Sequence, residues 1–274
     1  MNGIVININP VIFSVGSFEL RWYSLAIMTG IIVALFLTVR ESRRKGIPEN
    51  EVFNLALWVV ISGIVGARLF HVIDDWSYYA ANPTFIWQFQ RGGLAIWGAL
   101  VGGGAATVGY AKWKHLPLAK LVDAMIPGVL VAQIIGRFGC IVNGDAYGGI
   151  TNLPWGFIYV NPGALIPEYL KGVPTHPYPV YEIIWNGLAL AAMWKLRSVF
   201  KKDGLLFLSY LPVYALGRFV LTYFRQENIW FWGLQEAQVI SIGIMAVSVP
   251  LLIYSLRKPG LHQENIAKGP APAG

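Results

Sequence analysis

The chain has 274 residues, of which 55% are hydrophobic and only 13% are charged, and its formal net charge is +7. A soluble domain usually carries about 25% charged residues, so this composition excludes an ordinary soluble protein and favours a helical membrane protein. The single cysteine, Cys140, excludes an intrachain disulfide, and the four histidines show no metal-ligand spacing. We therefore expect neither a metal nor a cofactor.

The N-terminal residues 1–21 have neither a basic region nor a small-residue cleavage site, so we expect an extracytoplasmic segment rather than a removable signal peptide. Seven apolar blocks follow, and each is close to the ~20 residues that an α-helix needs to cross a bilayer. They cover residues 22–39, 52–73, 92–111, 121–142, 178–194, 205–224 and 233–256. The expected fold is an all-α integral membrane protein, with one domain of seven transmembrane helices over residues 22–256.

The segments between the blocks alternate in charge. Of the 21 Lys and Arg residues, 14 lie in one alternate set of segments, four lie in the other set, and three lie inside blocks. Because cytoplasmic segments carry the excess of Lys and Arg, this pattern predicts an extracytoplasmic N-terminus and a cytoplasmic C-terminus. It also explains the basic charge without nucleic acid, which we do not expect as a partner. The larger outer loops would be 74–91 and 144–177, and residues 257–274 would form a cytoplasmic, disordered tail.

Ionisable residues inside hydrocarbon are costly, and so they are functional candidates. With the predicted orientation, those within or beside the blocks fall near the outer leaflet, Asp123 excepted. These ionisable residues are Arg68, His71, Arg137, Asp145, Glu182, Arg218 and Arg225. The polar residues Tyr23 and Asn143 are expected at the same depth. Arg binds phosphate through a planar, bidentate contact, and a phosphate at this depth is most simply a phospholipid headgroup. A set of structural ion pairs is the alternative interpretation.

Glycines in the second and third blocks favour close helix packing. Gly98 and Gly102 have the spacing of two small residues that lets helix backbones approach in a membrane. Gly92 and Gly93 lie at the mouth of the third block, where they could instead let a ligand approach the backbone.

The stretch 136–148 reads GRFGCIVNGDAYG. It resembles the signature of the prolipoprotein diacylglyceryl transferases, G-R-x-G-N-F-x-N-x-E-x-x-G. Other segments are similar to the same family and follow in order over most of the chain. They are RWY at 21–23, GAR at 66–68, GGL at 92–94, HP at 176–177 with YE at 181–182, and GRF at 217–219 with Arg225.

This resemblance implies a bacterial cell (inner) membrane enzyme that takes part in lipoprotein biosynthesis. The family transfers the diacylglyceryl group of phosphatidylglycerol to the thiol of a lipobox cysteine in a prolipoprotein, forming a thioether and releasing glycerol phosphate. On the resemblance, Arg137 and Arg218 match the essential arginines. Tyr23, Asn143 and Gly148 match other sensitive positions, and Asp145 stands where the family has Glu.

Two sets of site residues follow from these arguments. The catalytic set is expected to be Arg137, Arg218, Asp145, Tyr23 and His176. The set that binds phosphatidylglycerol is expected to be Arg137, Arg68, Asn143, Gly148, Glu182 and Arg225.

The chain departs from the family pattern at three positions. Cys140 replaces the first Asn of the signature, Trp97 replaces a His proposed as base, and Thr222 replaces a Glu that follows the second essential Arg. The general base therefore stays open among His176, His71 and Asp145. We expect Cys140 to be a small packed residue rather than a nucleophile.

Two other functions compete with this interpretation. A lipid-binding or transport protein without chemistry could use the same arginines, although we find no internal repeat of the kind common in transporters. A phosphatidyl transferase that uses a nucleotide-activated lipid would need a metal and a cytoplasmic cluster of Asp, which the sequence does not have.

Overall fold

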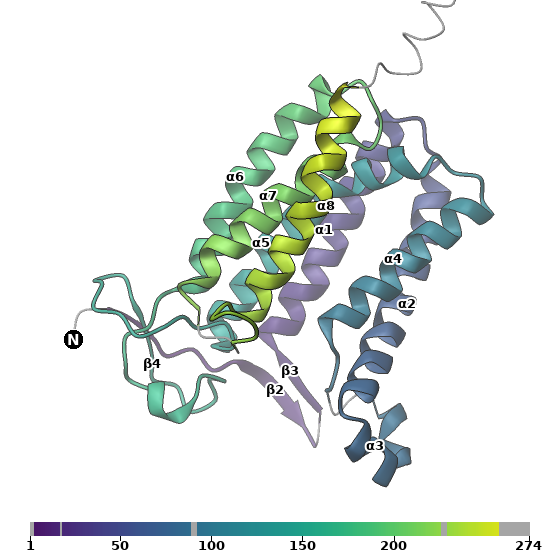
Figure 1. Cartoon of the computed structure of the whole chain (residues 1–274). Helices are drawn as coiled ribbons and strands as arrows, with labels where there is room; N and C mark the ends of the chain where they lie inside the picture. The colour runs from purple at the N-terminus through teal and green to yellow at the C-terminus, as the bar shows by residue number, and fades with distance from the viewer. Residues whose placement is uncertain (1–2, 17, 89–91, 226–228, 258–274) are drawn as a thin grey trace, which may run out of the picture. The chain divides into compact units, whose positions relative to one another are not determined.

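The computed structural model describes residues 3–16, 18–88, 92–225 and 229–257 (Figure 1). Seven long helices account for most of these residues. They are α1 (Trp22–Arg44), α2 (Glu49–Asp74), α4 (Ile96–Trp113), α5 (Leu118–Asn143), α6 (Tyr178–Val199), α7 (Leu205–Thr222) and α8 (Glu236–Arg257). Each coincides with one of the seven apolar blocks, so the helix prediction is confirmed within the described residues.

Five of these helices are long and apolar enough to cross a membrane, namely α1, α2, α5, α7 and α8. Helix α4 is rich in glycine, and α6 carries the buried polar side chains Glu182 and Asn186. Both features lower mean hydropathy without shortening the helix. The structure therefore supports a helical protein with several membrane-spanning helices, and the count of seven spans stays a prediction.

The expectation of an all-α fold is wrong outside the long helices. A hairpin forms from β2 (Val11–Val15) and β3 (Phe18–Arg21), and β1 (Ile4–Ile6) pairs in parallel with β4 (Phe157–Tyr159). These segments contain many β-branched and aromatic residues, which fit a pleated surface. The predicted outer loops also contain short helices, α3 (Trp76–Ala81), η1 (Pro83–Trp87) and η3 (Glu168–Leu170). The predicted disordered tail, beyond residue 257, lies outside the described residues.

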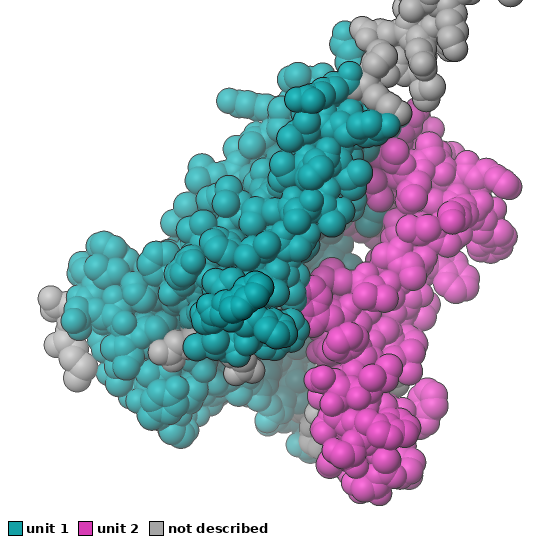
Figure 2. Space-filling view, in the orientation of Figure 1, with its two compact units in different colours: residues 1–34, 125–274 teal, residues 35–124 magenta. Residues whose placement is uncertain are grey.

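The chain divides into two compact units, shown in different colours in Figure 2. Unit 1 comprises residues 1–34 and 125–274, and unit 2 comprises residues 35–124. A single bundle over residues 22–256 therefore stays a prediction.

Unit 2 is built on the packing of α2 against α4. A Cβ added to Gly66 would lie 2.4 Å from the Gly98 carbonyl oxygen, and one added to Gly102 would lie 2.2 Å from that of Ser62. No side chain fits there, so the two backbones touch along a glycine seam. The prediction of close helix contact at Gly98 and Gly102 is therefore confirmed.

Unit 1 packs α5, α6 and α7 around an apolar core that includes Leu130, Met193 and Leu206, all buried. Helix α7 lies close to α6 because Gly217 leaves room for the Trp185 ring, whose Nε1 donates to the Val213 carbonyl at 3.1 Å. The strands lie at the end of this bundle where α1 and α6 begin (Figure 1). That end of the bundle carries the candidate site.

Candidate active site

Four helix ends meet at the strand-bearing end of unit 1. Helix α1 begins beside Tyr23 and α6 begins at Tyr178, while α5 ends at Asn143 and α7 ends at Thr222. Tyr23 packs with Cys140 and Tyr178 in one cluster. A Cβ at Gly139 would lie 3.1 Å from the Tyr23 Cα, so glycine is what lets α5 approach α1 here.

One carboxylate joins the two arginines that the sequence singled out. Glu182 on α6 accepts a hydrogen bond at Oε1 from Arg137 Nη2 on α5 at 2.9 Å, and Arg137 Nε contacts its Oε2. The same Oε1 accepts from Arg218 Nη1 on α7 at 3.2 Å. Glu182 is buried, whereas the Arg137 and Arg218 side chains keep 24% and 19% of their surface exposed. Two positive charges thus share one negative charge.

Tyr178 completes this cluster. Its hydroxyl accepts a hydrogen bond from Arg218 Nη1. The guanidinium carbons of Arg225 and Arg218 lie 5.2 Å and 5.9 Å from the centre of its ring. Cations at such distances from an aromatic ring are attracted to it. The buried ring therefore brings a third arginine to the Arg137–Arg218 pair.

Gly148 ties the loop after α5 to the end of α7. It pairs with Arg225 in an antiparallel bridge, and its N–H donates to the His176 carbonyl at 3.1 Å. A Cβ at this position would lie 2.5 Å from the Phe224 carbonyl oxygen and 2.8 Å from that of His176. Because both neighbours are backbone atoms, only glycine fits between them.

His176 lies at the edge of an apolar cavity of about 400 Å³ between α6 and α7. Its Nδ1 is 3.2 Å from the Tyr181 hydroxyl, which accepts a hydrogen bond from Trp155 Nε1 at 3.2 Å. Partial burial lowers the pKa of His176 below its ordinary value of 6.5. The lowered pKa favours the neutral form of the imidazole at pH 7.

Asn143 and Asp145 differ sharply in their surroundings. Asn143 is buried, and its Oδ1 has no hydrogen-bond partner within the described part of the chain. A buried amide oxygen of this kind calls for a ligand or water. Asp145 is exposed to solvent two residues later.

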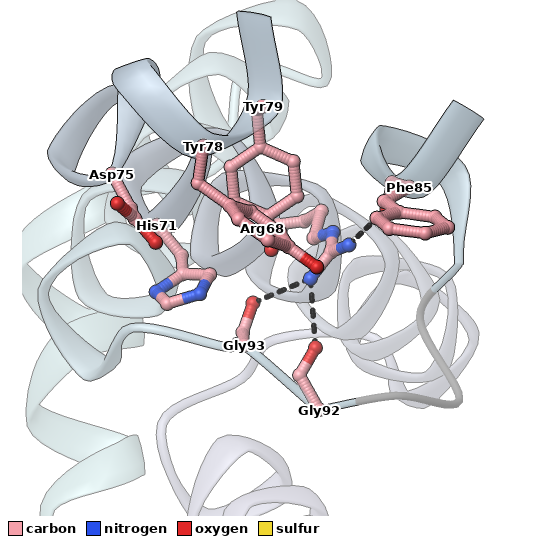
Figure 3. Close-up of a pocket in the computed structure, with 8 residues that line it drawn as sticks. All are labelled: Arg68, His71, Asp75, Tyr78, Tyr79, Phe85, Gly92 and Gly93. Carbon is pink, nitrogen blue, oxygen red and sulfur yellow. Dashed lines mark hydrogen bonds between the residues drawn. The ribbon is translucent and has the colours of Figure 1, made fainter. Parts of the chain in front are cut away.

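Arg68, in unit 2, is held by backbone oxygens (Figure 3). Its Nε donates to the Ile86 carbonyl at 2.9 Å, and its Nη1 donates to Gly92 and Gly93 at 2.7 Å and 3.0 Å. Its Nη2 donates to the Phe85 carbonyl. These bonds occupy most of the donors of a guanidinium, so the structure gives Arg68 a role in closing the loop after α3. Its predicted contact with phospholipid is not tested and stays a prediction.

Arg68 lines a pocket together with His71 and with Gly92 and Gly93, the two glycines at the mouth of the third apolar block. Gly92 and Gly93 both have positive φ, 81° and 72°, and a Cβ at Gly93 would lie 2.6 Å from His71 Nε2. The cavity, of about 220 Å³, is also lined by Asp75 and Tyr78. These glycines therefore serve a tight turn against Arg68 and His71, and a ligand at this turn stays a prediction.

Comparison with known proteins places the chain in a family. A sequence profile described as prolipoprotein diacylglyceryl transferase matches residues 10–254. The chain belongs to the prolipoprotein diacylglyceryl transferase family. It is a multi-pass membrane protein and a transferase, as the family and the apolar helices indicate.

Three relatives carry the name phosphatidylglycerol–prolipoprotein diacylglyceryl transferase. The protein of Dehalococcoides mccartyi is 38% identical over 92% of this chain and 96% of its own. That of Clostridioides difficile is 36% identical over 85% and 89%, and that of Lysinibacillus sphaericus is 35% identical over 93% and 94%. The chain is thus similar to these transferases over nearly its whole length.

The structure shows what surrounds the three residues that depart from the family pattern. Cys140 is buried, with its Sγ 3.7 Å from Arg137 Nη1. Thr222 is fully buried and its hydroxyl bonds to the Arg218 carbonyl, one turn earlier on α7. Trp97, on α4 in unit 2, is 37% exposed.

The sequence pointed to neither Tyr178 nor Trp155 as a site residue, and it gave Tyr181 no role although Tyr181 lies in the YE match at 181–182. A usable signal exists for Tyr178, because it precedes Glu182 by four residues and both therefore lie on one face of α6. No comparable signal exists for Trp155, which reaches Tyr181 from a loop 26 residues earlier.

Proposed function

We propose that this chain transfers the diacylglyceryl group of phosphatidylglycerol to the cysteine thiol of a prolipoprotein lipobox. The names of its relatives support this substrate pair. The observation that carries the proposal is the pair of arginines on α5 and α7 that share the Glu182 carboxylate. A positively charged, partly exposed cluster at the end of a membrane helix bundle suits the phosphodiester of a lipid headgroup.

The reaction exchanges one bond to carbon for another. The thiolate sulfur attacks the glyceryl carbon that carries the phosphate, the C–S bond forms, and the C–O bond to phosphate breaks. The electron pair of that bond leaves on the glycerol phosphate, and the thiol proton goes to a base or to water. No net oxidation takes place and no cofactor is consumed.

Arg137 and Arg218 would act on the charge that moves in this exchange. In the proposal they hold the phosphodiester and stabilise the charge that grows on the departing phosphate. The same cations favour the thiolate over the thiol, because a nearby positive charge lowers a thiol pKa. Tyr23, Asn143, Gly148 and Arg225 would shape the remainder of the headgroup site.

The general base is the least constrained role. Burial lowers the pKa of His176 and favours its neutral form, which can accept a proton, whereas Asp145 is exposed and less suited to desolvated chemistry. His176 is our candidate, with its ring held by Tyr181.

We further propose seven membrane spans, with α4 and α6 crossing alongside the five most apolar helices. The alternating Lys and Arg content supports an extracytoplasmic N-terminus and a cytoplasmic C-terminus. In that orientation the Arg137–Glu182–Arg218 cluster faces the outer leaflet of the bacterial cell membrane, where secreted prolipoproteins would reach it.

Purified protein incubated with phosphatidylglycerol and a lipobox peptide tests the proposal by release of glycerol phosphate. Arg137→Ala should lose about 100- to 1,000-fold in turnover, the order seen when a preorganised hydrogen-bond donor is removed. Arg43→Ala is a matched control, because that arginine is 62% exposed and pairs with Glu49 in unit 2. Near-normal turnover in Arg137→Ala would refute the phosphate clamp. Lipid binding without any glycerol phosphate would favour the lipid-binding or transport alternative.

A further inference from the structure

Both oxygens of the Glu182 carboxylate are used by the two site arginines. Oε1 lies between Arg137 Nη2 at 2.9 Å and Arg218 Nη1 at 3.2 Å, and Oε2 contacts Arg137 Nε. The arginines come from α5 and α7, and Glu182 comes from α6. One side chain therefore links three helices at a single point.

Glu182 is fixed in place by its own helix. Tyr178 and Asn186, one turn away on either side, lie on the same face of α6 and are buried, as Glu182 is. Arg218 bonds to the Tyr178 hydroxyl as well as to Glu182, so the guanidinium has two fixed acceptors on neighbouring turns. Because Glu182 is only 7% exposed, its carboxylate cannot turn into water.

The charges explain why such a link is needed. Two guanidinium groups at one carboxylate would repel each other if that carboxylate were neutral, and the repulsion is strong where water is scarce. Each would then turn toward other acceptors, and a lipid phosphate would meet only one of them at a time.

We infer that Glu182 is the positioning residue of the site: it aligns Arg137 and Arg218 as one phosphate clamp and limits the net positive charge of that clamp. This inference rests on the proposed function. The inference adds a distinct prediction to that function. Glu182 would repel the lipid phosphate in the ground state, yet it would improve the alignment of the two arginines that the transition state needs.

Glu182→Gln separates these two effects. Turnover should fall by about 100-fold, the order that a displacement of about 1 Å of the acting groups can cost. The KM for phosphatidylglycerol should not rise, and sn-glycerol phosphate should inhibit or bind more tightly, because the clamp gains one net positive charge. A residue that only supports the fold would lower thermal stability and leave anion affinity unchanged.

Glu182→Asp and Asn186→Gln serve as a second variant and a control. Asp keeps the charge but withdraws the carboxylate by one methylene, so turnover should fall with glycerol phosphate affinity unchanged. Asn186→Gln disturbs the same buried face of α6 one turn further on, and it should leave glycerol phosphate affinity at the wild-type value.

The outcomes distinguish this inference from the proposed function. If the wild-type protein releases no glycerol phosphate, the proposed function fails, and calorimetric binding of sn-glycerol phosphate to wild type and Glu182→Gln still tests the clamp. Equal affinity in those two proteins, or wild-type turnover in Glu182→Gln, would overturn the role of Glu182. If Glu182→Gln does not fold, wild-type turnover in Glu182→Asp would overturn it instead.

Discussion

Replacing Gly148 with alanine should disrupt the junction between the α5–α6 loop and the end of α7. The new Cβ would lie 2.5 Å from the Phe224 carbonyl oxygen, 2.6 Å from His176 Cβ and 2.8 Å from the His176 carbonyl oxygen. All three atoms belong to the backbone or its first side-chain carbon, so none can turn aside. The loop must move away from both segments.

The size of the effect follows from what that movement breaks. The Gly148 N–H bonds to the His176 carbonyl at 3.1 Å, and the Gly149 N–H bonds to the Phe224 carbonyl at 2.9 Å. Each such bond is worth about 1 kcal/mol net, and overpacking costs about 1–3 kcal/mol. We expect a loss of about 3 kcal/mol, which corresponds to a fall of roughly 6–12 °C in Tm. Turnover should fall by about 100-fold, because Arg225 and His176 both shift.

Thermal unfolding in detergent and the glycerol phosphate assay measure these two effects. Gly187→Ala is the matched control, because it lies on α6 and a Cβ there would meet no atom within 4 Å. That variant should be as stable as wild type or slightly more so, since alanine favours a helix over glycine by about 1 kcal/mol. If Gly148→Ala unfolds and turns over like Gly187→Ala, the steric argument is wrong.

Three further predictions concern single side chains. Arg68→Lys should lower the free energy of unfolding by about 3 kcal/mol in denaturant titration, because lysine cannot bond four carbonyls at once; an unchanged midpoint would contradict this. His176→Gln should abolish the acid limb of the pH–turnover profile. Since burial lowers the pKa of His176 below 6.5, wild-type turnover and the linked stability should hold above pH 6.5 and decline as the pH falls through that lowered pKa; parallel profiles would exclude His176. Cys140→Ser should keep at least about half of the turnover, because a buried Cys is ordinarily a packing residue. A folded but inactive variant would instead support Cys140 as a nucleophile.

The helices were predictable because their signal is continuous. The block at 52–73 became α2, Glu49–Asp74, and the block at 205–224 became α7, Leu205–Thr222. A run of apolar residues long enough to cross a bilayer has few structural options other than a helix. The pairing of β1 with β4 was not predictable in this way, because it joins segments more than 150 residues apart in the chain.

The candidate site was predictable in part. Charged residues in apolar blocks singled out Arg137, Glu182 and Arg218, and the structure brings those three together. The sharing of one carboxylate was not predictable, since it depends on how α5, α6 and α7 are rotated about their axes. Arg68 looked equivalent to Arg137 and Arg218, because it also lies in an apolar block. Its side chain instead bonds to a loop, and no periodicity in the sequence reveals the path of that loop.

The glycine seam between α2 and α4 bears on how this protein would respond to heating. The seam joins backbone to backbone, at Gly66, Gly98 and Gly102, and in a bilayer its separation would expose those surfaces to lipid chains rather than to water. The heat-capacity increase that marks unfolding of soluble proteins comes from hydrating apolar surface. A calorimetric transition that parts these helices within the membrane should therefore show a small heat-capacity step.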